Sequence, residues 1–313
     1  MRRRTFLAAT AAATAACSGL ETNSVPETSL DASAGPLQII DTHIHLFDTE
    51  REQGVPWPPK DDPIKYKPTL PGRFVETVEG LPVEGAVAVE ASPWVEDNRW
   101  LLETAHTDPI MIGVVGNLEP GTAEFAPLLE ELAADSLFKG IRSGSLWDRD
   151  FHAGVRSEAY VADVARLAER GLSLDSANPS TKLLEDLLTL TEKVPTLQVV
   201  VDHLPKVFPP ADEADRYKAA LREIAQRPNI AVKVSAVLRQ GEGYDLALYQ
   251  DKLDEMWETF GADRVLYGSD WPNSLPLGSY RQVLGIVQEY FATKSAEARA
   301  KYFRENAKRV YRL

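Results

Sequence analysis

Residues 39–48 read Ile39-Ile40-Asp41-Thr42-His43-Ile44-His45-Leu46-Phe47-Asp48, a hydrophobic run that ends in two histidines. Alternate side chains of an extended strand point the same way, so His43 and His45 should project together. Histidine is the commonest metal ligand, and the pair therefore suggests the beginning of a metal site. For an isolated pair, the alternative is two hydrogen-bonded histidines at the mouth of a loop.

Length and composition allow a large core. The chain has 313 residues, 44% of them hydrophobic, which suits either two domains or one α/β barrel. A formal net charge of −13 argues against nucleic acid or an anionic membrane surface as a partner of the folded part. The single cysteine, Cys17, excludes an intrachain disulfide and a thiolate metal cluster.

The first 36 residues read as a targeting segment followed by a linker. Arg3-Arg4-Thr5-Phe6-Leu7 and the alanine-rich run that follows resemble a twin-arginine export signal, which predicts a signal over residues 1–17. Thr14-Ala15-Ala16-Cys17 also resembles a lipoprotein cleavage box, so a lipid at Cys17 would be the only membrane attachment. Residues 18–36 suit a flexible linker. We expect an exported protein of the periplasm or cell envelope.

From residue 37 onward, short apolar runs alternate with amphipathic stretches of helical period. The apolar runs predict eight strands: Leu37–Asp41, Gly85–Glu90, Met111–Val115, Phe138–Ile141, Leu172–Asp175, Leu197–Val201, Ile230–Val234 and Arg264–Tyr267. Eight strand–helix units predict one (β/α)8 TIM barrel over residues 37–313. A doubly wound sheet is the alternative, and the lack of a glycine-rich phosphate turn argues against it.

Polar side chains follow the predicted strands, at the end where a (β/α)8 barrel carries its active site. They are His43, His45, Glu90, Arg142, Asp175, Asp202, His203, Lys233, Ser235 and Asp270. The proline- and charge-rich segment Phe47–Gly72 follows the first strand, and its length suggests a lid or a pocket wall.

These residue types suit the metal-assisted attack of water on a carbonyl. His43, His45 and Asp270 could bind one divalent ion through two nitrogens and an oxygen and leave a position for water. Such an ion lowers the pKa of water to about 7 and polarises the carbonyl. Asp270 is the predicted general base, and His203 would orient the water or polarise the carbonyl.

The remaining polar and aromatic residues are candidates for substrate binding. Arg142 and Lys233 suit a carboxylate or a developing oxyanion. An equal alternative is a buried ion network in which Glu90 and Asp175 are their structural partners. Aromatic walls suit a flat ring or a sugar face, which makes Trp94 and Trp271 candidates, together with Glu90.

The order and spacing of six motifs resemble the amidohydrolase superfamily, and most closely its lactonase-like branch with the sugar-lactone and 2-pyrone-4,6-dicarboxylate lactonases. The motifs are Asp41-Thr42-His43-Ile44-His45, Phe138-Lys139-Gly140-Ile141-Arg142, Val201-Asp202-His203, Val232-Lys233-Val234-Ser235, Gly268-Ser269-Asp270-Trp271-Pro272 and Asn306-Ala307-Lys308-Arg309-Val310-Tyr311. The resemblance implies a (β/α)8 fold of the metal-dependent hydrolase type, a site of His43, His45, His203 and Asp270, and hydrolysis of a cyclic ester.

Two departures from the binuclear members of that superfamily bear on the metal. Those members carry a carboxylated lysine or a glutamate after the fourth strand and a histidine after the fifth, where this chain has Arg142 and Asp175-Ser176. The resemblance therefore implies one divalent ion, zinc first and manganese as the alternative. Some lactonases of the branch use their histidines without a metal, so a metal-independent site stays open.

The sequence thus predicts an exported hydrolase that opens a lactone, a small-molecule substrate. The alternatives are a decarboxylase that uses the same scaffold and a catalytically silent barrel that binds carbohydrate. Assembly into a homo-oligomer is left open.

Overall fold

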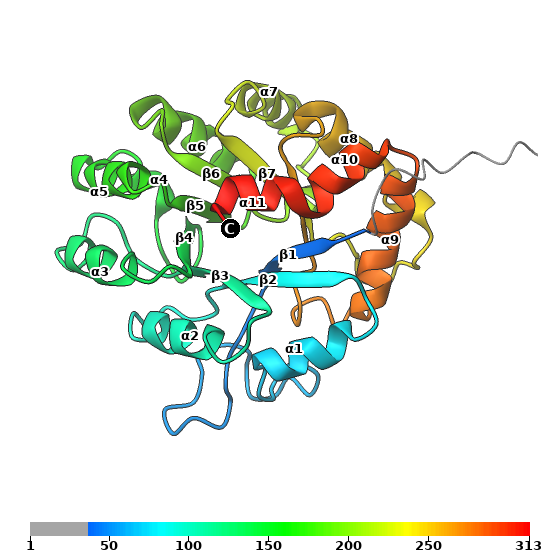
Figure 1. Cartoon of the computed structure of the whole chain (residues 1–313). Helices are drawn as coiled ribbons and strands as arrows, with labels where there is room; N and C mark the ends of the chain where they lie inside the picture. The colour runs from blue at the N-terminus through cyan, green and yellow to red at the C-terminus, as the bar shows by residue number, and fades with distance from the viewer. Residues whose placement is uncertain (1–36) are drawn as a thin grey trace, which may run out of the picture. The chain divides into compact units, whose positions relative to one another are not determined.

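The computed structural model describes residues 37–313, and its strands form one eight-stranded parallel sheet in the order β1 to β8 (Figure 1). The predicted (β/α)8 barrel is confirmed. The strands are β1 Ile39–Ile44, β2 Val83–Val89, β3 Met111–Gly116, β4 Phe138–Gly144, β5 Ser173–Ala177, β6 Gln198–Val201, β7 Ile230–Ser235 and β8 Val265–Gly268.

Helices surround the sheet in Figure 1, and the predicted apolar stripes lie on α3, α6, α7 and α8. The helices are α1 Pro71–Val78, α2 Asp97–Ala105, α3 Phe125–Leu132, α4 Phe151–Gly154, α5 Glu158–Glu169, α6 Thr181–Lys193, η1 Leu204–Lys206, α7 Ala214–Ile224, η2 Leu246–Leu248, α8 Gln250–Phe260, α9 Tyr280–Ala292, α10 Ala296–Ala300, the π-helical η3 Lys301–Glu305 and α11 Asn306–Tyr311.

Several strands are longer at their carboxyl ends than the sequence predicts. β1 continues past Asp41 to Ile44, and β4 continues past Ile141 to Gly144. The prediction followed runs of apolar residues, so polar residues at the carboxyl ends of these two strands were left out. In this barrel, Asp41, His43 and Arg142 are buried and belong to the strands themselves. The carboxyl ends of these strands are therefore polar although they are buried.

The seam between β1 and β8 closes through individual hydrogen bonds. The amide of Asp270 donates to the carbonyl of His43 (2.9 Å), and the amide of His45 donates to the carbonyl of Trp271 (2.8 Å). The hydroxyl of Thr42 donates to the carbonyl of Tyr267 (2.6 Å). Because these bonds satisfy buried polar groups, they fix the ends of the two strands against each other.

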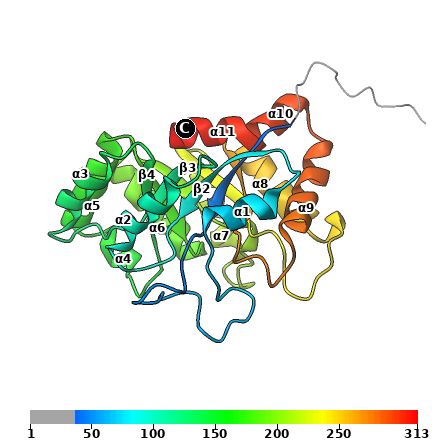
Figure 2. The same ribbon diagram turned by 60° about the horizontal axis from the view of Figure 1, so that its bottom comes forward.

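The C-terminal helices cover the end of the barrel that is opposite to the loop after β1. In Figure 2, α10 and α11 lie on one side of the strands, and the loops that follow β1 lie on the other. Tyr302 donates a hydrogen bond to the carbonyl of Val234 (3.1 Å), and the Tyr311 hydroxyl donates to Asp175 Oδ2 (2.6 Å) in the barrel interior. The η3 helix is thereby attached to β7, and the last helix, α11, is attached to β5.

The predicted export signal at 1–17, with Cys17, and the linker at 18–36 lie outside the described residues. Among residues 37–313, no helix is long and apolar enough to cross a membrane.

The contact between Tyr311 and Asp175 predicts a stability effect. Tyr311→Phe removes a hydrogen bond to a buried carboxylate, and we expect the free energy of unfolding to fall by about 1.5–3 kcal/mol in urea denaturation. Tyr244→Phe is the matched control, because the Tyr244 hydroxyl donates to the carbonyl of Leu277 in an exposed loop (3.0 Å). Equal losses in the two variants would contradict the proposed attachment of the last helix.

Candidate active site

His43, His45 and Asp270 meet at the closed seam of the barrel. His45 Nε2 lies 3.4 Å from Asp270 Oδ1, and His43 Nε2 lies 3.8 Å from the same oxygen. Two atoms that ligate one ion at 2.0–2.2 Å with tetrahedral geometry lie about 3.3 Å apart. The three side chains thus form a group with the spacing of metal ligands.

The contacts of the two imidazoles with the rest of the protein involve their Nδ1 atoms, so both Nε2 atoms face Asp270. His45 Nδ1 lies 3.0 Å from the carbonyl of Val89, an acceptor, so the proton belongs on Nδ1 and Nε2 carries the free lone pair. His43 Nδ1 lies 3.5 Å from Asp202 Oδ1 and 3.2 Å from Lys233 Nζ, on the side of the ring away from Asp270. His43 Nε2 and Asp270 Oδ1 are buried without a hydrogen-bond partner. These residues fit a divalent metal ion, because an ion would satisfy both atoms.

His203 completes the group from the end of β6. Its backbone is left-handed (φ 55°), as is that of Asp270 (φ 60°), and such strained residues gather at functional sites. His203 Nε2 lies 3.7 Å from Asp270 Oδ1, while Nδ1 lies 2.8 Å from the hydroxyl of Ser235. Asn273, which the sequence analysis missed, donates to Asp270 Oδ2 (2.9 Å) and fixes the carboxylate. Only its position three residues after Asp270 could have indicated it.

Burial controls the charges of the group. Desolvation lowers the pKa of His203 to about 4 and holds the pKa of His43 well below its usual value, so both imidazoles are neutral at pH 7. Burial opposes ionisation of Asp270, but His203, His45 and His43 outweigh it and hold the pKa of this carboxyl below its usual range. The site therefore presents neutral nitrogen donors and an ionised oxygen donor.

Lys233 lies below the histidines and Asp270, and its side chain does not reach solvent. Its side chain is 0% exposed, and Nζ lies 2.6 Å from Asp175 Oδ2, 3.0 Å from Asp202 Oδ1 and 3.2 Å from His43 Nδ1. Burial opposes its charge, but the two carboxylates raise the pKa of Lys233. These contacts match the alternative of a buried ion network, while the assignment of Lys233 to substrate binding stays a prediction.

Arg142 is held at the end of β4 by Glu90. Arg142 Nε donates to Glu90 Oε1 (2.7 Å), and Nη2 donates to the carbonyl of Glu90 (2.9 Å). The other carboxylate oxygen of Glu90 accepts from the amide of Ser92 and from the indole of Trp147, both at 3.0 Å. The hydrogen bonds of Glu90 are thus directed to the protein, and its carboxylate sets the orientation of the guanidinium.

The two predicted tryptophans have different surroundings. Trp94 is 36% exposed and lines a pocket beside the site. Trp271 is 1% exposed, with its ring 5.3 Å from that of Phe74 on α1 and beneath the guanidinium of Arg73 (5.5 Å). The ring of Trp271 thus packs between the barrel and α1, and its assignment to substrate binding stays a prediction.

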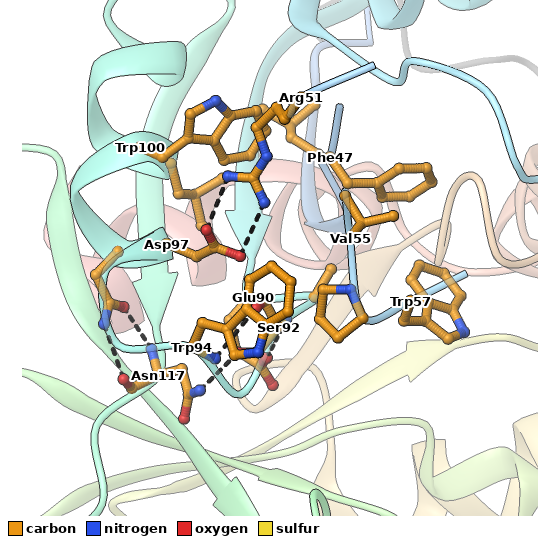
Figure 3. A pocket seen from close by; sticks show the side chains of 15 residues that line it. Phe47, Arg51, Val55, Trp57, Glu90, Ser92, Trp94, Asp97, Trp100 and Asn117 are labelled. Carbon is orange, nitrogen blue, oxygen red and sulfur yellow. Dashed lines mark hydrogen bonds and ion pairs between the residues drawn. The ribbon is translucent and has the colours of Figure 1, made fainter. Parts of the chain in front are cut away.

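The pocket lies between the loop after β1 and the start of α2 (Figure 3). Phe47, Arg51, Val55 and Trp57 come from the long loop, which therefore forms a pocket wall as predicted. Trp100 also lines the pocket, from α2. The Trp57 ring lies 5.6 Å from the ring of His45, so the pocket adjoins the histidine group.

Comparisons with known proteins agree with this geometry. An L-fucono-1,5-lactonase of Burkholderia ambifaria is 27% identical over 281 residues, which cover 88% of this chain and 95% of that protein. The crystal structure of a Burkholderia multivorans amidohydrolase with bound HEPES is 26% identical, with a TM-score of 0.78, and covers 88% of this chain and 99% of that one. A second crystal form, with bound zinc, is 26% identical with a TM-score of 0.75 and the same coverage.

A family model decides the classification. The model described as amidohydrolase matches residues 40–313, which include all eight strands and every residue of the group around Asp270. The chain belongs to the amidohydrolase family.

Proposed function

We propose that the protein is a hydrolase that opens a lactone by the attack of water on the ring carbonyl. The observation that carries the proposal is the convergence of His43, His45 and His203 on one oxygen of Asp270. The L-fucono-1,5-lactonase names of two relatives, at 27% and 28% identity, support a cyclic ester as the substrate.

The side chains of the site account for the two proton transfers of lactone hydrolysis. Asp270, ionised and fixed by Asn273, accepts a proton from the attacking water as the new C–O bond forms. His203 faces Asp270 through Nε2 and orients the water. When the tetrahedral carbon collapses, the ring C–O bond breaks and Asp270 returns the proton to the ring oxygen, which leaves a hydroxy acid. A bound divalent ion would polarise the carbonyl and acidify the water.

Arg142 is the residue that we propose to bind the oxyanion or the product carboxylate. Burial opposes the charge of Arg142, but Glu90, Asp202 and Asp270 raise its pKa, which supports a charged guanidinium close to the histidine group. Glu90 holds two of its nitrogens from behind, so the guanidinium has little freedom to lose when it binds. Glu90 itself then acts as a positioning residue.

We propose zinc as the ion that His43, His45 and Asp270 bind. Two imidazole nitrogens and one carboxylate oxygen with an open position are typical of catalytic zinc. The Burkholderia multivorans relative was crystallised with zinc, which supports the same choice. Manganese accepts the same donors and is the alternative. Loss of activity after chelation, and recovery with one ion rather than the other, decides between them and a metal-independent site.

The reaction products distinguish lactone hydrolysis from the alternative functions. Opening of a lactone consumes water and releases a hydroxy acid, while a decarboxylase releases carbon dioxide. Decarboxylases of the same fold are below 20% identity and share the fold alone. A silent carbohydrate-binding barrel would bind sugars and turn over no lactone.

Substitution of Asp270 tests the proposed base. Asp270→Asn keeps the size of the side chain and removes its basicity, so we expect kcat to fall by about 100- to 10,000-fold on a lactone panel. Asp163→Asn is the matched control, because Asp163 on α5 accepts a hydrogen bond from the amide of Gly121 outside the site. Full activity of Asp270→Asn, with its metal content unchanged, would disprove the role of base.

The low pKa of His203 predicts a pH dependence of stability. The folded protein keeps His203 neutral down to about pH 4, whereas the unfolded chain takes up this proton near pH 6.5. Stability is therefore lost as the pH falls from 6.5 toward 4. His203→Asn should reduce the loss between pH 6.5 and 4.5 by about 2 kcal/mol in urea denaturation of metal-stripped protein. Equal losses in the variant and the native protein would contradict the assigned environment.

We also propose that the protein is exported through a twin-arginine route, as residues 1–17 suggest. Replacement of Arg3 and Arg4 with lysine should retain the full-length precursor in the cytoplasm, because the paired arginines are the recognised feature. Immunoblots of cytoplasmic and periplasmic fractions measure this. Unchanged delivery of the shortened protein to the periplasm would contradict the route.

A further inference from the structure

The loop after β4 carries a tryptophan in a backbone conformation that suits glycine. A hydrogen bond from the amide of Arg149 to the carbonyl of Leu146 (3.2 Å) closes a four-residue turn. Its two central residues, Trp147 and Asp148, both have a positive φ, 57° and 60°. Turns of this kind favour glycine, asparagine and aspartate, and a bulky side chain in this region is strained. Asp148 therefore suits the turn, whereas Trp147 does not.

Contacts on both sides of the turn hold this strained conformation. Before the turn, the carbonyl of Ser145 accepts a hydrogen bond from the side chain of Asn178 (2.8 Å). After the turn, the Asp150 carboxylate accepts from the amide of Ala153 (3.0 Å) and caps α4. Strained residues persist only where their surroundings determine the conformation, and they gather at functional sites. The two attachments thus give the side chain of Trp147 a fixed direction.

The indole of Trp147 points to the carboxylate that orients Arg142. Its Nε1 donates to Glu90 Oε2 (3.0 Å), while Glu90 Oε1 accepts from Arg142 Nε (2.7 Å). Glu90 is 3% exposed and Arg142 is 7% exposed, so water competes little for these bonds. Trp147 itself is half-buried. One buried carboxylate therefore joins the loop after β4 to the guanidinium at the end of that strand.

The contacts of Arg142 leave one of its nitrogens for a ligand. Nε donates to the side chain of Glu90, and Nη2 donates to the backbone carbonyl of the same residue. Among residues 37–313, Nη1 has no hydrogen-bond partner. Because a guanidinium is planar, the direction of Nη1 is fixed once Glu90 is fixed. A movement of the Glu90 carboxylate would therefore move the donor that meets the oxyanion.

We propose that Trp147 is a positioning residue for Arg142, because its indole N–H fixes the Glu90 carboxylate and thereby directs the guanidinium at the oxyanion of lactone hydrolysis. The proposal rests on the proposed function and adds to it a residue that acts through Glu90. It also accounts for the residue type in the turn. A glycine would relieve the strain but would bring no donor to Glu90.

Two substitutions separate the N–H group from the aromatic ring. Trp147→His keeps an N–H at the same place of a five-membered ring, and Trp147→Phe keeps an aromatic ring without a donor. We expect kcat on glucono-1,5-lactone to fall about 10-fold in Trp147→Phe, the effect of one hydrogen bond to a charged group, and by about 2-fold or less in Trp147→His. KM should stay within about 2-fold in both variants, because the oxyanion forms only in the transition state.

The opposite order of the two variants would overturn the proposal, because it would assign the effect to the ring. Equal losses of kcat in both variants would overturn it as well. Trp147→Gly fits the turn without strain and serves if Trp147→Phe fails to fold, and its kcat should fall at least 10-fold. Trp257→Phe is the matched control and should keep its kcat, because Trp257 is a half-buried residue of α8 whose ring packs on Phe291 of α9 (5.6 Å).

A measurement without substrate separates failure of this proposal from failure of the proposed function. The indole ¹H–¹⁵N signal of Trp147, identified by its loss in Trp147→Phe, reports the hydrogen bond to Glu90. We expect the signal to shift in Glu90→Gln, which weakens the acceptor, and to keep its position in Asp163→Asn, because Asp163 accepts from the amide of Gly121 outside the site.

An unchanged signal in Glu90→Gln would overturn the proposal even if the native protein hydrolyses glucono-1,5-lactone. A shifted signal in a protein that hydrolyses no lactone would support the connection from Trp147 to Glu90 and count against the proposed function alone.

Discussion

Two backbone hydrogen bonds at the seam between β1 and β8 hold the active site together. The amide of Asp270 donates to the carbonyl of His43, and the amide of His45 donates to the carbonyl of Trp271. The residues that close the barrel are therefore the same residues that converge on the proposed ion. Because closure of a barrel fixes the stagger of its strands, the spacing of the three side chains follows from the fold rather than from a flexible loop.

A buried ion network inside the barrel supports this seam from below. Lys233 lies between Asp175 and Asp202, and it contacts His43. Removal of one partner from such a network leaves a buried charge uncompensated, which is far more costly than the pair is favourable. Tyr311 adds a hydrogen bond to Asp175 from the last helix. The position of His43 thus depends on residues from β5, β6, β7 and α11.

The eight strands and the strand-end positions of His43, His45, His203 and Asp270 could be predicted, because apolar runs and the polar residues that follow them are local features. The direction in which a side chain points at the end of a strand could not be predicted. Lys233 and Trp271 follow the same pattern as the site residues, yet one points into the barrel axis and the other packs under α1. Tyr311 and Asn117 reach their partners through contacts between distant segments, which no local pattern records.

The central claim is that His43, His45 and Asp270 form a ligand set for one ion. Anomalous diffraction from crystals grown with zinc, collected above and below the zinc edge, tests it directly. The account predicts a single anomalous peak within about 2.0–2.2 Å of His43 Nε2, His45 Nε2 and a carboxylate oxygen of Asp270. A peak at another place, or two peaks bridged by these side chains, would contradict it.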